Sequence, residues 1–268
     1  MSTGGQGFAS TRAWPVRVRR PGERRSLSRS ATRALDVLEY FGLVRRPLRA
    51  IEIAKALELH PSTTDQLLKT MVDSAHLVFD ARNKTYAPSH RLARFSAWIV
   101  ESYGANSGLR VLVSEVQAAC GEVVTLTTPN DLFMQVVDLA GAAPIGQAAE
   151  RGLKVSLFGT SIGAAYLSTL SDAEIGRLAV RARLAAAEKA DVLADVERVR
   201  QEGFAEGPTA GGEAWSLATP LPVQGLTPMV LGLAGPVDRV RADQPRLQAM
   251  MRTAVARWAA AAPVTGVL

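Results

Sequence analysis

The stretch PSTTDQLLKTMVDS, residues 61–74, decides the fold of the N-terminal third of the chain. If it is a helix turning about 100° per residue, one narrow face holds Thr64, Leu67, Leu68 and Met71. The opposite side then holds mainly small polar groups, with an amide, one lysine and one acid: Ser62, Gln66, Lys69 and Asp73, with Thr63 and Thr70 beside them. Such groups can approach base edges and phosphates closely. The pattern indicates either a recognition helix for DNA or an ordinary amphipathic surface helix, and this stretch alone leaves both open.

Two shorter helices are predicted before this stretch. Ser28 or Ser30 can cap the first one, and Gly42 and Pro47 are predicted to end it. The second is predicted over residues 50–57, where the apolar residues again follow helical spacing. Two helices that lead into a third through a short turn are typical of a helix-turn-helix.

A hairpin is predicted after the third helix. Residues 76–80 and 85–88 alternate weakly between apolar and polar, and a polar turn separates them. Arg82 and Lys84 lie in that turn, so the hairpin has a basic tip. Three helices and a basic hairpin make a winged helix-turn-helix, in which Arg82 and Lys84 touch phosphate or the minor groove.

Several strings in this region, taken in order, resemble the isocitrate-lyase-regulator (IclR) family of transcription factors. They are SATRALDVLE at 30–39, IAKAL at 53–57, PSTTDQLLKTM at 61–71, and the wing from Asp80 to Tyr86 followed by Arg91-Leu92. The resemblance implies sequence-specific binding to double-stranded operator DNA, and self-association into dimers that often pair into tetramers. A repressor is the more usual role in such a family.

The resemblance has departures that prevent any transfer of an operator sequence. Gln66 stands where the family usually has a basic residue, and Asp65 where it has a ring-bearing or apolar one. Glu58 and His76 stand where glycine is common. An acid at residue 65 faces a polyanion poorly, although it could accept a hydrogen bond from a cytosine amine.

The charge of the chain is divided unevenly. Basic residues exceed acidic ones by nine in residues 1–100, whereas acidic residues exceed basic ones by three in residues 101–268. Seven arginines and one glutamate lie in residues 1–29. This indicates a basic N-terminal module facing a polyanion, or a solvated arginine-rich tail that inflates the count. With one cysteine, Cys120, and no apolar stretch that suits a span or an export signal, we expect a cytoplasmic protein without a disulfide or membrane contact.

A connecting helix is predicted over residues 90–103. Leu92, Phe95 and Ile99 recur at helical spacing, with Trp98 beside them. This stripe fits packing against a partner subunit, which agrees with the dimers that the resemblance implies. The alternative is that the stripe packs on its own domain.

The rest of the chain is predicted to form an antiparallel sheet with flanking helices, an α+β arrangement. Strands are predicted at 123–128, 132–139, 215–221 and 228–234, and helices at 109–119, 159–170, from 171, 188–202 and 237–261. The strings that resemble the IclR effector domain, which is related to the GAF fold, are CGEV (120–123), GTSIGAA (159–165), RQEGF (200–204), LATPL (217–221) and LGLAGP (231–236).

No catalytic or metal site is predicted in this second domain. All three histidines precede residue 91, so residues 101–268 offer no histidine as a base or a metal ligand. The segment Gly159-Thr160-Ser161-Ile162-Gly163 has no lysine for a phosphate loop and lacks the dinucleotide pattern. We therefore expect no enzyme activity, metal or cofactor.

The resemblance instead implies a pocket for a small organic effector between the sheet and the loop before residue 159. Gly159 is expected to line this pocket, and the backbone N–H groups at Thr160 and Ser161 could hold a carboxylate. Gly232 and Ala234 stand where the family often has serine, which would widen the pocket, and Trp215 would add a flat apolar wall. These residues predict a larger, partly apolar or aromatic acid, unless Trp215 simply fills the core.

The sequence thus predicts five regions. They are a flexible basic arm (1–26), a winged helix-turn-helix (27–88), a linker and dimerisation helix (89–104), an effector domain (105–262) and a tail (263–268). The predicted function is a sequence-specific regulator, expected to be a repressor, that responds to a small organic acid. The alternative is a GAF-type sensor or enzyme-like protein that binds a small molecule but no specific DNA.

Overall fold

The computed structural model describes residues 17–19, 28–102, 108–141, 150–209, 212, 214–222 and 228–261. The chain divides into two compact units. We name residues 24–102 the winged unit, and residues 103–268 together with 1–23 the sheet unit. The predicted tail at 263–268 and most of the predicted arm lie outside the described residues.

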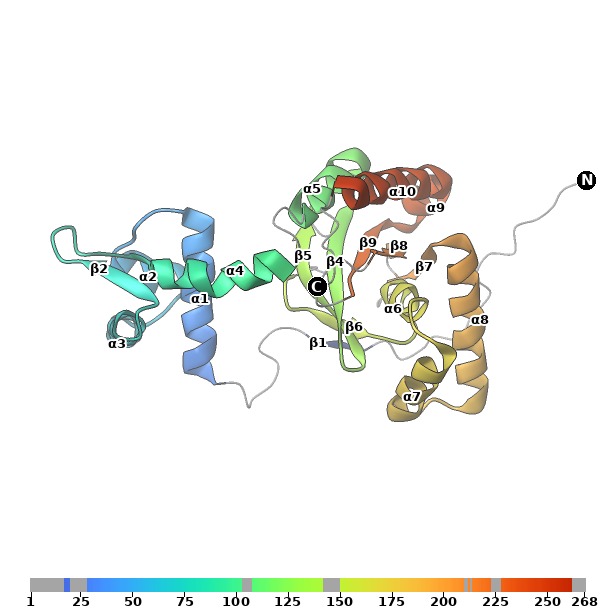
Figure 1. Cartoon of the computed structure of the whole chain (residues 1–268), viewed down its shortest axis with the longest axis horizontal. Helices are drawn as coiled ribbons and strands as arrows, with labels where there is room; N and C mark the ends of the chain where they lie inside the picture. The colour runs from blue at the N-terminus through green and yellow to red at the C-terminus, as the bar shows by residue number, and fades with distance from the viewer. Residues whose placement is uncertain are drawn as a thin grey trace, which may run out of the picture. The chain divides into compact units, whose positions relative to one another are not determined.

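The winged unit contains four helices and a hairpin among its described residues (Figure 1). They are α1 (Arg29–Val44), α2 (Ala50–Ala56), α3 (Pro61–Asp73), β2 (Leu77–Asp80), β3 (Thr85–Pro88) and α4 (His90–Ser102). The side chain of Ser28 caps α1 by accepting from the N–H of Ala31. The prediction that Gly42 ends this helix is wrong, because α1 continues to Val44, which packs on the core of the unit, and ends at Arg45 in the left-handed conformation.

A small apolar core holds these elements together. Its buried members are Val37, Phe41, Leu48, Ile53, Leu68, Met71, Leu77 and Tyr86. Leu48 and Tyr86 exchange both backbone hydrogen bonds, at 3.0 and 2.8 Å, so the segment after α1 pairs with the hairpin. Since burying one such side chain contributes about 1.5–3 kcal/mol, these contacts fix the position of α3 relative to the hairpin.

The turn between α2 and α3 has a backbone conformation that suits glycine. Glu58 has a φ of 52°, in the left-handed region that side-chain-bearing residues rarely adopt. The N–H of Leu59 nevertheless bonds the carbonyl of Ala54 at 2.9 Å and closes the turn. The glutamate therefore replaces a residue type that would adopt this geometry with less strain.

The sheet unit is built on one antiparallel sheet. Its strands are β1 (Val18–Arg19), β4 (Val123–Asn130), β5 (Phe133–Ala140), β6 (Lys154–Ser156), β7 (Ala205–Pro208), β8 (Ala214–Pro220) and β9 (Val230–Pro236). Their order across the sheet is β1-β6-β5-β4-β9-β8-β7, and every neighbouring pair is antiparallel. Together with the helices below, this confirms the α+β class predicted from the sequence.

Helices cover both faces of this sheet (Figure 1). The α10 face is covered by α5 (Leu109–Cys120), α9 (Val237–Ala242) and α10 (Gln244–Ala261), and the α6 face by α6 (Ser161–Leu167), α7 (Asp172–Ala182) and α8 (Ala186–Glu202). On the α10 face Leu217 and Leu233 pack with Met251, whereas Val230 lies in the core of the α6 face. Successive residues of β8 and β9 therefore point alternately to the two helical layers.

Three features of the sheet unit differ from the sequence prediction. The helix predicted over 237–261 is broken at Asp243, and Pro245 in the first turn of α10 explains the break, because it has no N–H to bond the carbonyl of Arg241 in a continuous helix. The helix predicted over 159–170 is shorter and begins at Ser161. Strands β1, β6 and β7 were not predicted, since runs of two to four residues carry little periodicity.

The first described strand also corrects part of the predicted flexible arm. Val18–Arg19 forms β1 and pairs with β6, so this part of the region assigned to 1–26 lies on the sheet unit. In the described part of the chain, no helix is long and apolar enough to cross a membrane.

Candidate functional site

Helix α3 is anchored by its apolar side. Leu68 and Met71 are buried in the core of the winged unit, and Thr64 is fully buried while its hydroxyl donates to the carbonyl of His60 at 3.2 Å. His60 caps the helix, because its Nδ1 accepts from the N–H of Ser62 at 3.4 Å. The residues that sequence periodicity places inward are thus the ones that hold α3 in the fold.

The opposite side of α3 is open to solvent. Ser62, Gln66, Lys69 and Thr70 are exposed, and Thr63 is half-buried. The hydroxyl of Thr70 donates to the carbonyl of Gln66 at 2.9 Å, so toward an outside partner it presents a methyl group and an acceptor. The side chains predicted to contact DNA therefore share one accessible face, and their contact with bases or phosphates stays a prediction.

Lys69 is not a free cation on this face. Its Nζ lies 2.8 Å from Oδ2 of Asp65, one helical turn earlier. The hydrogen bond to Asp65 raises the pKa of Lys69 above its usual value, so the ammonium stays charged. The acid nevertheless offsets part of the positive charge that a phosphate would meet, which is a direct consequence of the departure at residue 65.

The tip of the hairpin is organised by one carboxylate. Asp80 accepts from the side-chain amide of Asn83 at 2.6 Å and from the N–H groups of Arg82 and Asn83 at 2.9 and 3.3 Å. These bonds, led by that from the Asn83 side chain, hold the pKa of Asp80 below its usual value. Because the turn is closed by its own backbone and Asp80, the side chains of Arg82 and Lys84 are left exposed at the tip.

Two further basic residues of the winged unit, Arg49 and Arg91, were not predicted as site residues from the sequence. Arg49 is exposed at the N-cap of α2. Its position directly before a predicted helix could have marked it as an exposed basic residue. Arg91, in α4, donates to the carbonyl of Ser74 at 3.2 Å and so ties the linker helix to the end of α3. No sequence pattern could reveal that tie, because it joins residues 17 positions apart through the tertiary fold.

Removing the acid beside Lys69 should strengthen DNA binding. In Asp65→Asn, the ammonium of Lys69 is freed and one negative charge leaves the exposed face, so we expect the affinity for duplex DNA to rise about threefold to tenfold at low salt. Fluorescence anisotropy with a labelled duplex measures the change. Asp73→Asn is the matched control, since Asp73 has the same charge at the far end of α3; equal gains from both variants would contradict a specific role of the Lys69–Asp65 pair.

The residues predicted to bind an effector begin at the N-terminus of α6. Thr160 caps this helix, as its hydroxyl donates to the carbonyl of Ser156 at 2.8 Å and accepts from the N–H of Gly163 at 3.1 Å. Ser161 lies 2.7 Å from the hydroxyl of Ser216, which itself donates to the carbonyl of Gly207 at 2.9 Å. Ser161 must therefore donate to Ser216, so both hydroxyl hydrogens at this helix end are already used.

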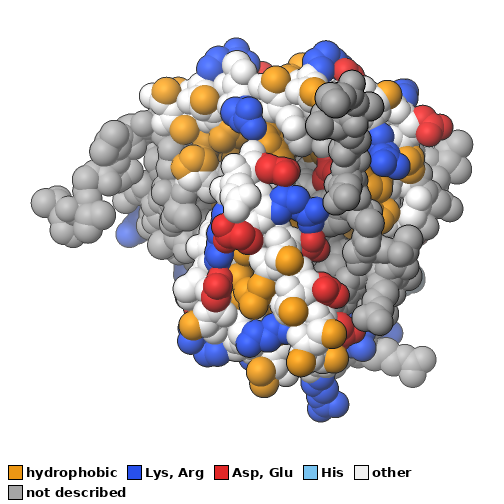
Figure 2. All heavy atoms as spheres, turned by 90° about the vertical axis from the view of Figure 1, so that its right-hand side faces the viewer, with side chains coloured by type: hydrophobic (Ala, Val, Ile, Leu, Met, Phe, Trp, Pro, Cys, Tyr) orange, Lys and Arg blue, Asp and Glu red, His pale blue; other side chains and the backbone are white. Residues whose placement is uncertain are grey.

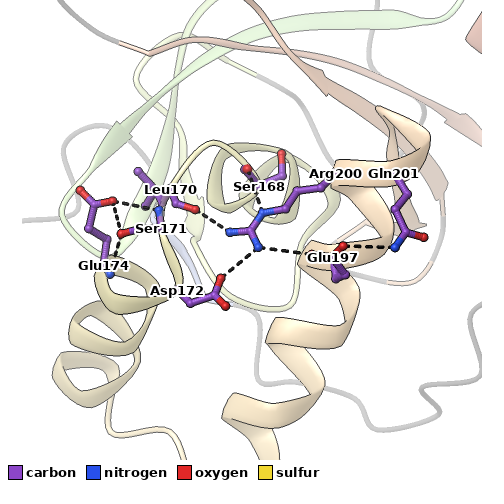
Figure 3. Close-up of polar contacts among 8 residues, drawn as sticks. All are labelled: Ser168, Leu170, Ser171, Asp172, Glu174, Glu197, Arg200 and Gln201. Carbon is purple, nitrogen blue, oxygen red and sulfur yellow. Dashed lines mark hydrogen bonds and ion pairs between the residues drawn. The ribbon is translucent and has the colours of Figure 1, made fainter.

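The other end of α6 is fixed by Arg200 of α8 (Figure 3). Its guanidinium donates to the carbonyls of Ser168 and Leu170, at 3.3 and 2.6 Å, and pairs with Asp172 at 2.9 Å. The labelled side chains converge from α8 and from the turn between α6 and α7. Arg200 thus satisfies carbonyls that the end of α6 leaves open and joins three helices on one face of the sheet.

The structure does not bring the six predicted effector residues together. Ser216 contacts Ser161 on the α6 face, so its neighbour Trp215 points to the α10 face, where it packs with that core and Arg241 of α9 lies 4.8 Å from its ring. The prediction that Trp215 forms a wall beside Gly159, Thr160 and Ser161 is therefore wrong. The alternative, that Trp215 belongs to the core, agrees with its position.

Gly232 does not widen a pocket either. A Cβ placed on Gly232 would lie 2.9 Å from Oγ1 of Thr125 and 3.0 Å from Ile162, so these two side chains already fill the space. Ala234 points to the same α6 face and is half-buried. The argument for a large aromatic acid consequently loses both of its structural supports.

The face of the sheet unit drawn in Figure 2 is of mixed charge. On this side, where α7 and α8 lie, acidic and basic side chains are interspersed. Arg200, for example, pairs with both Asp172 and Glu197. Within the described ranges, no group of three or more His, Cys, Asp or Glu side chains is placed to hold a metal ion.

Comparison with known proteins gives a consistent picture. Residues 30–78 match the model of the IclR helix-turn-helix domain. A crystal structure of an IclR family transcriptional regulator from Brucella abortus is similar over 90% of this chain and 95% of its own, at 18% identity and a TM-score of 0.53.

Two further crystal structures have the same fold. A regulator of this type from Alicyclobacillus acidocaldarius matches 87% of this chain and 98% of its own, at 18% identity and a TM-score of 0.53. The IclR protein of Thermotoga maritima matches 85% and 98%, at 13% identity and a TM-score of 0.52. No curated protein sequence matches the chain. The structural likeness covers both units and shows the fold.

Proposed function

We propose that this chain is a transcriptional regulator of the IclR type, and that it is a repressor which a small organic acid releases from its operator. The match of residues 30–78 to the IclR helix-turn-helix model and the shared fold support this proposal. The Brucella abortus structure with this fold is a transcriptional regulator, which supports the regulatory function predicted from the sequence. The proposal includes a cytoplasmic location, where both DNA and a metabolic acid are available.

One observation carries the DNA-binding part of the proposal. Helix α3 is held in the core by Thr64, Leu68 and Met71, while the side with Ser62, Gln66 and Lys69 is exposed. An ordinary surface helix usually carries several charges on its open side, whereas this side consists mainly of hydroxyls and an amide. Together with Arg82 and Lys84 at the hairpin tip, this side supports insertion into the major groove with the wing on phosphate.

The decisive experiment is salt-dependent binding to the promoter region beside the protein's own gene. Phosphate contacts release counterions, so the logarithm of the binding constant falls by about 0.9 per contact for each tenfold rise in salt. We expect at least about a 100-fold loss of affinity between 50 and 200 mM salt. An affinity for DNA that does not change with salt concentration would contradict the proposal.

Self-association through the winged unit is part of the proposal. Leu35 and Leu43 of α1 are 60% and 76% exposed, which is unusual for leucines on a helix of a small domain. The stripe predicted on α4 would extend such a surface, but the side chains of Phe95, Trp98 and Ile99 lie outside the described residues. A dimer doubles the phosphate contacts and lets two copies of α3 span two half-sites.

The effector is proposed to bind on the α6 face near Thr160. Hydrogen bonding uses the hydroxyls of Thr160 and Ser161, so a carboxylate would have to be held by backbone N–H groups at the start of α6. Since Trp215 lies on the other face, we propose an organic acid without committing to an aromatic one. The acid shifts the protein away from DNA only by its differential affinity for the free and bound forms.

A thermal-shift screen of aliphatic and aromatic acids tests whether the protein binds an organic acid. An acid at about 100 times its dissociation constant stabilises the folded protein by about 2.7 kcal/mol, which is a shift of about 5–10 °C for a unit of this size. An acid that binds in this way should also lower the affinity for the promoter duplex. Stabilisation without any effect on DNA binding would contradict the regulatory role of the acid.

A further inference from the structure

The N-terminal basic segment docks on the edge of the sheet unit. Val18 and Arg19 pair with Val155 and Lys154, which makes β1 the outermost strand beside β6. The N–H of Ser156 donates to the carbonyl of Arg17 at 2.9 Å, and the N–H of Arg17 donates to Oγ of Ser156 at 2.6 Å. Backbone pairing of this kind is the way an extended peptide adds to an exposed sheet edge.

One side chain also contributes to the docking. The guanidinium of Arg19 lies 4.3 Å from the ring centroid of Phe133, at the start of β5. A cation over an aromatic face at an exposed site contributes about 0.5–1 kcal/mol. The edge is therefore suited to an extended segment with a basic residue at the position of Arg19.

The docking contains an opposing interaction that keeps it weak. Arg19 stands directly opposite Lys154 across the strand pair, and like charges in such a position are destabilising. The strand is only two residues long, and Val18 remains 41% exposed. A few hydrogen bonds and one cation–aromatic contact against this repulsion leave a strand that can detach.

The same segment is the most basic part of the sequence. Residues 12–29 contain seven arginines and a single glutamate. A polyanion competes for these charges, because each phosphate contact gains free energy from counterion release. The contacts of Arg17 use its backbone N–H and carbonyl, whereas the guanidinium of Arg19 lies over Phe133. That guanidinium cannot lie over the ring and on a phosphate at the same time, so the docked strand and a DNA-bound Arg19 exclude each other.

We propose that the edge of β6 is a docking site for the chain's own residues 17–19, and that this basic segment exchanges between the sheet edge and DNA phosphates. The exchange rests on the proposed function, whereas the docking does not. Ser156 links the docking site to the candidate effector face, because its carbonyl accepts the hydroxyl of Thr160 at 2.8 Å while its other groups hold Arg17. The docked segment thereby reduces the fraction of protein whose arm is available to DNA.

The variant Ser156→Ala tests the exchange. It removes the hydroxyl that binds Arg17 and leaves the backbone carbonyl that binds Thr160. Freeing the arm should raise the affinity for a mixed-sequence DNA duplex at low salt about threefold to tenfold, in proportion to the docked fraction removed. The same substitution in a chain that lacks residues 1–26 should change nothing.

Thr253→Ala is the matched control, because its hydroxyl bonds only the carbonyl of Ala249 in its own helix. It should leave DNA affinity unchanged in both backgrounds. An equal gain from Ser156→Ala with and without residues 1–26, or no gain in either, would overturn the exchange between edge and DNA.

Amide hydrogen exchange tests the docking without DNA. Deleting residues 1–26 should speed exchange at the Ser156 N–H, which donates to Arg17, but not at the Leu157 N–H, which donates to Leu132 at 3.0 Å. Adding duplex DNA to the full chain should have the same selective effect on Ser156. Unchanged protection of Ser156 on deletion would overturn the docking, protection retained in a DNA complex would overturn the exchange alone, and a full chain that binds no DNA would instead contradict the proposed function.

Discussion

Gly163→Ala is expected to destabilise the sheet unit by about 3 kcal/mol or more. A Cβ at Gly163 would lie 1.8 Å from the carbonyl oxygen of Leu157. A backbone oxygen cannot rotate away as a side chain can, so either α6 or the loop before it must move. Because Thr160 caps this helix and Arg200 fixes its other end, such movement also disturbs the face proposed for the effector.

Urea denaturation followed by tryptophan fluorescence measures this change, as Trp215 and Trp258 both belong to the sheet unit. Gly42→Ala is the control of opposite sign. Gly42 lies inside α1 with nothing within 4 Å of an added Cβ, so alanine should stabilise the winged unit by about 0.5–1 kcal/mol. A neutral result for Gly163→Ala would mean that α6 does not sit against Leu157 as described.

The double variant Lys69→Ala/Arg82→Ala is expected to weaken DNA binding by about 30- to 100-fold at low salt. Lys69 on α3 and Arg82 at the hairpin tip are both exposed, and without them two phosphates keep their counterions, which removes two favourable contributions to binding. The salt dependence should become shallower by about 0.9 for each phosphate that is no longer neutralised. Titration of a labelled duplex at several salt concentrations measures both quantities.

Each single variant should account for part of the loss, and the two parts should add because the residues lie on separate elements. Arg177→Ala is the control, since Arg177 is an exposed arginine on α7 of the sheet unit. Arg177→Ala removes one positive charge, as each single variant does, and should alter the affinity for DNA less than twofold. A control effect as large as that of Lys69→Ala would show that overall charge, and not the face of α3, governs binding.

The helices of the winged unit and most of the sheet could be predicted because their signals are local. Apolar spacing located α2 and α3 to within a residue, and the capping box at Ser171 and Glu174 marked the start of α7. One missed boundary also had a local signal: Pro245 has no N–H to continue the helix across Asp243, so the last helix breaks there.

Local sequence patterns also predict one part of the candidate site, the exposed side of α3, but not the other, the effector face. The exposed side of α3 follows from helical periodicity, which the sequence displays directly. The Lys69–Asp65 pair was also within reach, since residues four apart on a helix are neighbours. The effector face was not, because it depends on which helical layer covers each face of the sheet.

The sequence by itself determined a helix-turn-helix with a basic hairpin and an α+β partner unit, since periodicity and turn residues act within a few positions of the chain. Only the tertiary structure decided that Trp215 and Ser216 serve opposite layers, that Thr125 and Ile162 close the space at Gly232, and that Arg17 reaches Ser156 across 139 positions. Contacts between distant segments depend on how whole elements pack, and no local pattern encodes them.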